Sequence, residues 1–197
     1  LFDRADTEVG DGREDRHGHL TRRIQVRRGR VVGDRHEGAP HAERTGAEAY
    51  VMPVPFFANT ADDRQILLSQ RGIGEVFELA RQSTLKMVGI GTAEHEASLV
   101  MTGMIEHSEI AEIKEAGGTG ELLGHFFDAH GNTVETTLTE RTMAISRADL
   151  EATRIVAVAG GKVKTHAIRA VLASGSLGGL ITDERTARAL VEEQPVG

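Results

Sequence analysis

Residues 155–190, IVAVAGGKVKTHAIRAVLASGSLGGLITDERTARAL, decide the fold. Ile155–Ala159 is a continuous apolar run of the kind that a central strand of a parallel sheet needs. Apolar residues at helical spacing predict a helix over Lys162–Ala173. A short strand over Leu180–Thr182 and a last helix over Asp183–Glu193 follow. The stretch therefore predicts a strand–helix–strand–helix unit.

Strands and helices also alternate upstream of this unit. Strands are predicted over Ala47–Val54, Lys86–Ile90, Glu121–Phe127, Thr133–Thr139 and Thr142–Ile145, and helices over Asp63–Gln70, Gly74–Gln82 and Glu106–Ala116. Such alternation indicates an α/β domain with a mostly parallel, doubly wound, Rossmann-like sheet.

The composition changes near residue 41. Residues 1–41 contain Arg but no Lys and carry a net charge of +1, against −8 for residues 42–197, which together give the −7 of the chain. We expect 1–41 to be an atypical, poorly packed segment, with one or two strands over Ile24–Val32, and 42–197 to be an effector-binding domain. A nucleic-acid-binding arm and an out-of-frame stretch of a GC-rich gene are alternatives for 1–41.

Composition also excludes several classes of protein. The chain has no Cys, which excludes disulfides and thiolate metal sites and favours the cytoplasm. It has no apolar run long enough to span a membrane, and its negative charge argues against gripping DNA by itself. The His residues have no metal-ligand spacing, and the sequence shows no Walker loop, nucleophile elbow or dinucleotide fingerprint, so we expect neither a metal nor a cofactor. The first residue is Leu, as expected of a fragment.

Three predicted strand ends carry residues that suit a ligand. They are Gly89–Thr92, then Gly160-Gly161 with Lys162 and Lys164, and then Thr182–Glu184. Ligands of such sheets bind beyond the carboxyl ends of the strands, where glycine amides, a helix N-terminus and a lysine can hold an anion. Taken singly, each piece is more often a tight turn, a helix cap or a solvated charge.

The same residues resemble a known family. Ala157–Leu190, Met87–Thr92 (MVGIGT), Gly117–Gly131 (GGTGELLGHFFDAHG) and Ala49–Leu68 are similar to segments of the SorC/DeoR-type sugar-binding transcriptional regulators. The resemblance covers about residues 42–192, and within the family it is closest to regulators of polyol catabolism of the erythritol type.

This resemblance implies an effector domain that is similar in fold to ribose-5-phosphate isomerase and glucosamine-6-phosphate deaminase. It implies a sugar, polyol or sugar phosphate as effector, a dimer or tetramer, and DNA binding only through a helix-turn-helix that this chain lacks. The family's phosphate-contacting lysine falls on Lys164, and Glu121 stands where the family usually has Asp. The G-x-G-x-T loop that opens the family's effector domain has no counterpart in residues 1–41. The expected effector site comprises Gly89, Gly91, Thr92, Gly120, Glu121, Gly160, Gly161, Lys164, Thr182 and Asp183.

Three functions are consistent with these patterns. We favour a non-catalytic effector domain of a transcriptional regulator. A sugar-phosphate isomerase or deaminase of the same fold would need a carboxylate base, for which Asp183, Glu184 and Glu121 are the candidates. The third function is an oligomerisation module with a vestigial pocket.

Overall fold

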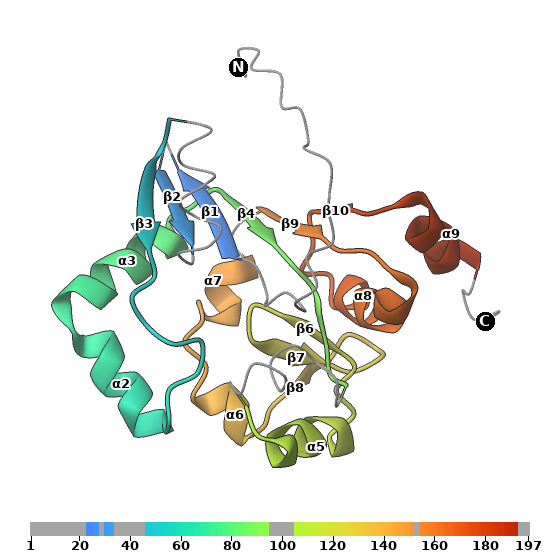
Figure 1. The fold of residues 1–197 in the computed structure, drawn as a ribbon, viewed down its shortest axis with the longest axis horizontal. Coiled ribbons are helices and arrows are strands. Elements are labelled where there is room, and N and C mark those ends of the chain that lie inside the picture. The colour runs from blue at the N-terminus through green and yellow to red at the C-terminus, as the bar shows by residue number, and fades with distance from the viewer. Residues whose placement is uncertain (1–22, 28–29, 34–45, 95–104, 152–153, 193–197) are drawn as a thin grey trace.

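The larger of two sheets contains the parallel strands that the sequence predicts. The structure is a computed structural model and describes residues 23–27, 30–33, 46–94, 105–151 and 154–192. Six strands lie in the order β10-β9-β4-β1-β2-β3 (Figure 1). Their bounds are β1 Arg23–Arg27, β2 Arg30–Gly33, β3 Glu48–Val51, β4 Leu85–Val88, β9 Arg154–Val158 and β10 Gly179–Ile181. Only β1 runs against the other five, so the expected α/β architecture with a mostly parallel sheet is confirmed.

A second, antiparallel sheet of four strands lies beside the first. It consists of β5 Gly91–Thr92, β6 Gly120–Leu122, β7 His125–Phe127 and β8 Thr133–Val134. The prediction of one strand over Glu121–Phe127 is wrong, because Leu123 and Gly124 have φ of 54° and 82° and form a two-residue hairpin turn between β6 and β7. Such turns need positive φ at both positions, and because Leu rarely adopts it, Leu-Gly is not recognisable as a turn.

The five predicted helices form with small shifts at their ends, and the short helices α6 and α7 form in addition. They are α2 Ala61–Ser69, α3 Arg71–Arg81, α5 His107–Glu115, α6 Thr137–Glu140, α7 Arg147–Glu151, the 3₁₀ turn η1 Lys162–Lys164, α8 Thr165–Ala173 and α9 Glu184–Glu192. None of these described helices is long and apolar enough to cross a membrane.

The strands predicted over Thr133–Thr139 and Thr142–Ile145 are largely wrong. Only β8 forms in the first of them, and α6 follows it, because the Thr136 amide donates to Thr139 Oγ1 at 2.9 Å and so caps a helical turn. In the second, Thr142 makes an isolated antiparallel bridge with Phe57.

The core lies on one face of the larger sheet. Val88, Ile155 and Ala157 point toward this face and are buried against Ala80 of α3, Leu150 of α7 and a group of apolar residues on α8. Figure 1 shows the same arrangement, with these three helices on one side of the sheet. Burial of these apolar side chains is the main force that holds the three helices against the sheet.

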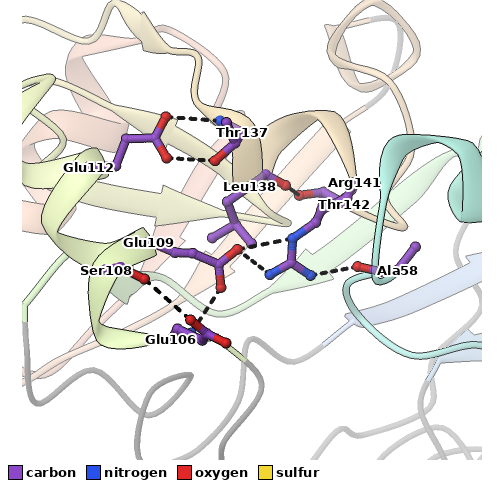
Figure 2. Close-up of polar contacts among 9 residues, drawn as sticks. All are labelled: Ala58, Glu106, Ser108, Glu109, Glu112, Thr137, Leu138, Arg141 and Thr142. Carbon is purple, nitrogen blue, oxygen red and sulfur yellow. Dashed lines mark hydrogen bonds and ion pairs between the residues drawn. The ribbon is translucent and has the colours of Figure 1, made fainter.

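An ion pair joins helix α5 to the segment after α6 and to the loop before α2. Arg141, which follows α6, binds the Glu109 carboxylate of α5 through two nitrogens and donates from Nη1 to the Ala58 carbonyl at 2.5 Å (Figure 2). Its guanidinium lies 5.5 Å from the centre of the Phe57 ring. The two side chains are only 16% and 18% exposed, so water screens the pair weakly.

We predict that Arg141→Ala destabilises the fold, because it leaves the Glu109 carboxylate and the Ala58 carbonyl without this donor. The free energy of unfolding should fall by about 2–4 kcal/mol in urea titrations. The matched control is Arg188→Ala, which breaks an exposed pair with Glu184 on α9 and should change it by less than about 0.5 kcal/mol. Equal losses in the two variants would contradict the structural role of Arg141.

Lys86 of β4 is fully buried on the core side of the sheet. Its ammonium donates to the Ser83 carbonyl at 3.3 Å. Burial lowers the pKa of Lys86, and the nearby Asp149 carboxylate opposes this shift. The unfolded chain therefore binds this proton more tightly than the folded chain does, and the protonation of Lys86 costs stability as the pH falls.

Lys86→Met should therefore stabilise the chain by about 1–3 kcal/mol at neutral pH, because it removes a buried charge at similar volume. The gain should shrink as the pH rises toward 10.5, the ordinary lysine pKa, where the folded and unfolded states both lose the proton. Thermal melts followed by circular dichroism at several pH values measure this trend, with Lys162→Met on the exposed η1 turn as the control. A gain that grows with pH would have the wrong sign and would contradict the interpretation.

Candidate functional site

Three neighbouring parallel strands end at one edge of the larger sheet. Val88 of β4 is level with Ala157 of β9, and Val158 of β9 is level with Ile181 of β10. The segments that follow the three strands therefore begin side by side. This register places Gly89, Gly160 and Thr182 at the same edge.

The pair Gly160-Gly161 is shaped by its neighbours at that edge. A Cβ on Gly160 would lie 2.4 Å from Asp183 Oδ2, so a larger residue would push the Asp183 side chain away. Gly161 has a φ of +102°, which disfavours every other residue. Its amide donates to Thr186 Oγ1 at 2.8 Å, which ties the glycine pair to α9.

Asp183 forms the N-cap of α9. Its two carboxylate oxygens accept from the Thr186 amide at 3.0 Å and from the Thr186 hydroxyl at 2.6 Å. The hydrogen bond from the Thr186 hydroxyl, with that from its amide, holds the pKa of Asp183 below its usual range. These two bonds satisfy an amide of the first turn of α9 and so stabilise the start of the helix. The neighbouring Thr182 Oγ1 is buried and has no hydrogen-bond partner in the described part of the chain.

Lys164 connects the glycine pair to the end of β4. It is half-buried at the end of η1, directly before α8, and its ammonium donates to the Ile90 carbonyl at 3.1 Å. The helix predicted over Lys162–Ala173 thus begins with a 3₁₀ turn, and this turn brings the Lys164 ammonium to the segment between Gly89 and Gly91. Lys162 is exposed, as expected of a surface charge.

The other four expected site residues lie in the antiparallel sheet. Gly91 is paired with Glu121, and Thr92 with Gly120. The Glu121 carboxylate is buried and accepts from the Gly124 amide, and its Oε2 lies 2.5 Å from where a Gly91 Cβ would stand. Glu121 therefore supports the β6–β7 turn of its own sheet.

Gly120 is the point where strand β6 of the smaller sheet lies against helix α8. A Cβ on it would lie 2.5 Å from the carbonyl oxygen and 3.1 Å from the Cα of Ala167 in α8. Strand β6 can therefore lie directly on the first half of α8. The ten expected residues thus form two groups, one around the glycine pair and one on β5–β6, with Lys164 between them.

Two groups of the candidate site were not predicted from the sequence, the Thr186 side chain and the Ile90 carbonyl. Thr186 is buried and links Gly161 to Asp183, and the spacing of Asp183 and Thr186, three residues apart at a helix start, is a capping signal that could have revealed it. The Ile90 carbonyl, which accepts from Lys164, has no sequence signal because every residue carries a carbonyl.

The histidines do not gather into a metal site in the described ranges. Three of them, His107, His130 and His166, are exposed. The half-buried His125 of β7 places Nε2 at 2.9 Å from the Ile145 carbonyl. His95 lies outside the described residues.

Comparisons with known proteins agree on one family. Residues 37–192 match the family model described as "Putative sugar-binding domain". The erythritol catabolism regulatory protein of Brucella abortus is 60% identical over 156 residues, which are 79% of this chain and 49% of that protein. The deoxyribonucleoside regulator of Bacillus subtilis is 32% identical over 143 residues, or 72% of this chain and 45% of that protein.

A solved structure extends the likeness to the fold. The sugar-binding domain of a transcriptional repressor from Vibrio fischeri superimposes with a TM-score of 0.71 at 25% identity, covering 78% of this chain and 62% of that chain. The present chain spans about half the length of the two regulators that it matches.

Gly120→Ala should disrupt the contact between β6 and α8, because its Cβ would meet the backbone of α8, which cannot turn aside as a side chain can. We expect a loss of at least about 2 kcal/mol in the free energy of unfolding. The control is Gly72→Ala in α3, where a Cβ meets open space and helix propensity should add about 0.5–1 kcal/mol. A tolerated Gly120→Ala, measured by urea unfolding, would show that β6 and α8 are not so close.

Proposed function

We propose that this chain, which belongs to the family of sugar-binding domains of SorC/DeoR-type transcriptional regulators, senses a sugar, polyol or sugar phosphate without transforming it. The observation that carries the proposal is the meeting of three strand ends, where the glycine pair, Lys164 and Asp183 surround one edge of the sheet. This edge is where doubly wound folds bind their ligands.

The chemistry of the edge suits a ligand with several hydroxyl groups. The Asp183 carboxylate and the unpartnered Thr182 hydroxyl can bond hydroxyls, and Lys164 adds a positive charge within reach of a phosphate. The first turn of η1 has backbone amides without intrahelical partners, which favour an anion. The 60% identity to an erythritol catabolism regulator makes erythritol and its phosphates the first effectors to test.

The carboxylates argue against the isomerase or deaminase alternative. An isomerase base needs a pKa near the working pH, whereas the pKa of Asp183 is lowered by its bonds to Thr186. Glu184 is paired with Arg188 on the exposed side of α9, and Glu121 bonds the turn of its own hairpin. The relatives in the comparisons are transcriptional regulators, which favours a sensor as well.

In the whole protein, we propose that ligand binding shifts a conformational or oligomeric equilibrium and so reports to a DNA-binding part. A ligand shifts such an equilibrium only by its difference in affinity for the two states. The net charge of −7 is consistent with a chain that senses the ligand and leaves DNA binding to another part, since a negative chain does not attract a phosphate backbone. The cytoplasm and a homo-oligomeric assembly, dimer or tetramer, are part of the same proposal.

A thermal-shift screen of erythritol, other polyols, sugars and their phosphates tests this function. A true effector at a hundred times its Kd should stabilise the fold by about 2.7 kcal/mol through mass action. Each stabilising compound is then incubated with the chain and assayed for turnover. Turnover would support the enzyme alternative, and the absence of any shift would favour the oligomerisation module.

Lys164→Ala should abolish the part of the shift that depends on a phosphate group, because it removes the cation beside the glycine pair. The matched control, Lys162→Ala, removes an exposed lysine two residues earlier and should keep the shift. If Lys164→Ala retained the full response to a phosphorylated ligand, the phosphate would bind elsewhere.

A further inference from the structure

The segment between β4 and β5 passes from one hydrophobic core to another, and we call it the connector. Strand β4 ends at Val88 in the larger sheet, and β5 begins at Gly91 in the smaller one. Between them, Ile90 is buried in the same core as Val88. Ala93, directly after β5, is buried in a second core with Ile110 of α5. Figure 1 shows this green segment running from the larger sheet to the smaller one. A turn of the backbone at Ile90 would therefore reach the second core.

A side chain from the distant η1 turn holds the connector in place. The Lys164 ammonium donates to the Ile90 carbonyl at 3.1 Å. Because Ile90 is only 2% exposed, its carbonyl cannot bond water if this donor leaves. A buried carbonyl without a donor costs free energy, and the backbone at Ile90 can turn to find another because it is flanked by Gly89 and Gly91.

A phosphate group at the edge of the sheet would compete with the Ile90 carbonyl for this ammonium. Under the proposed function, on which this inference rests, Lys164 is the cation that meets the phosphate of the effector. A hydrogen bond between two charged groups is stronger than one from an ammonium to a neutral carbonyl. The hydroxyl of a polyol is a neutral acceptor like the carbonyl, so it has no such advantage.

The neighbouring strand of the smaller sheet gives the connector a fixed reference. A Cβ on Gly120 of β6 would meet the backbone of Ala167 in α8. A Cβ on Gly131, between β7 and β8, would meet the backbone of Ala173 and Ser174 at the end of the same helix. Two points of the smaller sheet are thus seated on α8, and β5 can shift only relative to β6.

We propose that the Lys164–Ile90 bond holds the connector in its ligand-free conformation, and that a phosphate group of the effector releases it by taking over the ammonium. The released connector turns at Ile90 and loosens the pairing of β5 with β6. The change reaches the second core at Ala93. An unphosphorylated polyol can bind at Asp183 without causing it, so the chain responds in this way only to a phosphorylated effector.

The first part of the test needs no ligand and measures hydrogen exchange by NMR at the amides of residues 91–93. Lys164→Met keeps the length of the side chain but removes its donor, and should speed this exchange by about tenfold. The matched control, Lys162→Met, changes an exposed lysine on the same turn and should leave the rate unchanged. The amides of α8 report any general loss of stability. Equal rates at 91–93 in Lys164→Met and the unchanged chain would overturn the proposal.

The second part uses the unchanged chain with inorganic phosphate, erythritol or an erythritol phosphate, each at a concentration that saturates its effect on the melting temperature. Both phosphate compounds should raise the melting temperature and yet speed exchange at residues 91–93 by about tenfold, whereas erythritol should not speed it. A phosphate compound that raises the melting temperature but leaves this exchange unchanged or slower would overturn the release and leave the sensor function standing. Faster exchange with erythritol would equally contradict release by phosphate. If no phosphate compound raised the melting temperature, phosphate sensing would fail together with the release.

Discussion

Strand β9 lies between β4 and β10, parallel to both, and the candidate site depends on the register of these two pairings. A slip of either pairing by one residue would turn every side chain of β9 to the other face, and Ile155 and Ala157 are too deeply buried to permit this. In the observed register the carboxyl ends of the three strands are level. The register in turn positions the residues that follow the strands. The glycine pair follows β9, Asp183 follows β10, and Lys164 bonds the segment after β4.

The regular part of the molecule was predictable because it depends on patterns that a sequence displays. The apolar run of Ile155–Ala159 identified the central strand, and the spacing of apolar residues identified α8 and α9. The hairpin at Leu123-Gly124 and the helix α6 were missed because they depend on one unusual φ and on threonine hydroxyls that cap a turn. Six of the ten expected site residues follow strands that the apolar pattern predicted, and the structure brings these strand ends together at one edge. The grouping around Lys164 depends on a contact across 74 positions of the chain, which no local pattern shows.

The acidic residues of the site illustrate how a binding scaffold differs from a catalytic one. Asp183 is committed to the start of α9, and Glu121 to a tight turn, so neither is held free for proton transfer. Fold alone permits either function, because one scaffold hosts many chemistries. The local bonds of these carboxylates favour a sensor.

The two hydrogen bonds that link Gly161 to Thr186 and Thr186 to Asp183 have the same donor-to-acceptor direction. The Gly161 amide donates to the Thr186 hydroxyl, and this hydroxyl has a single proton, which it donates to Asp183. An ionised carboxylate has no proton and can only accept hydrogen bonds. A ligand group that bonds Asp183 must therefore be a hydrogen-bond donor. The Asp183 carboxylate would thus distinguish an alcohol from the carbonyl or ether oxygen of an otherwise similar molecule, because the two protons of this chain of bonds both point toward it.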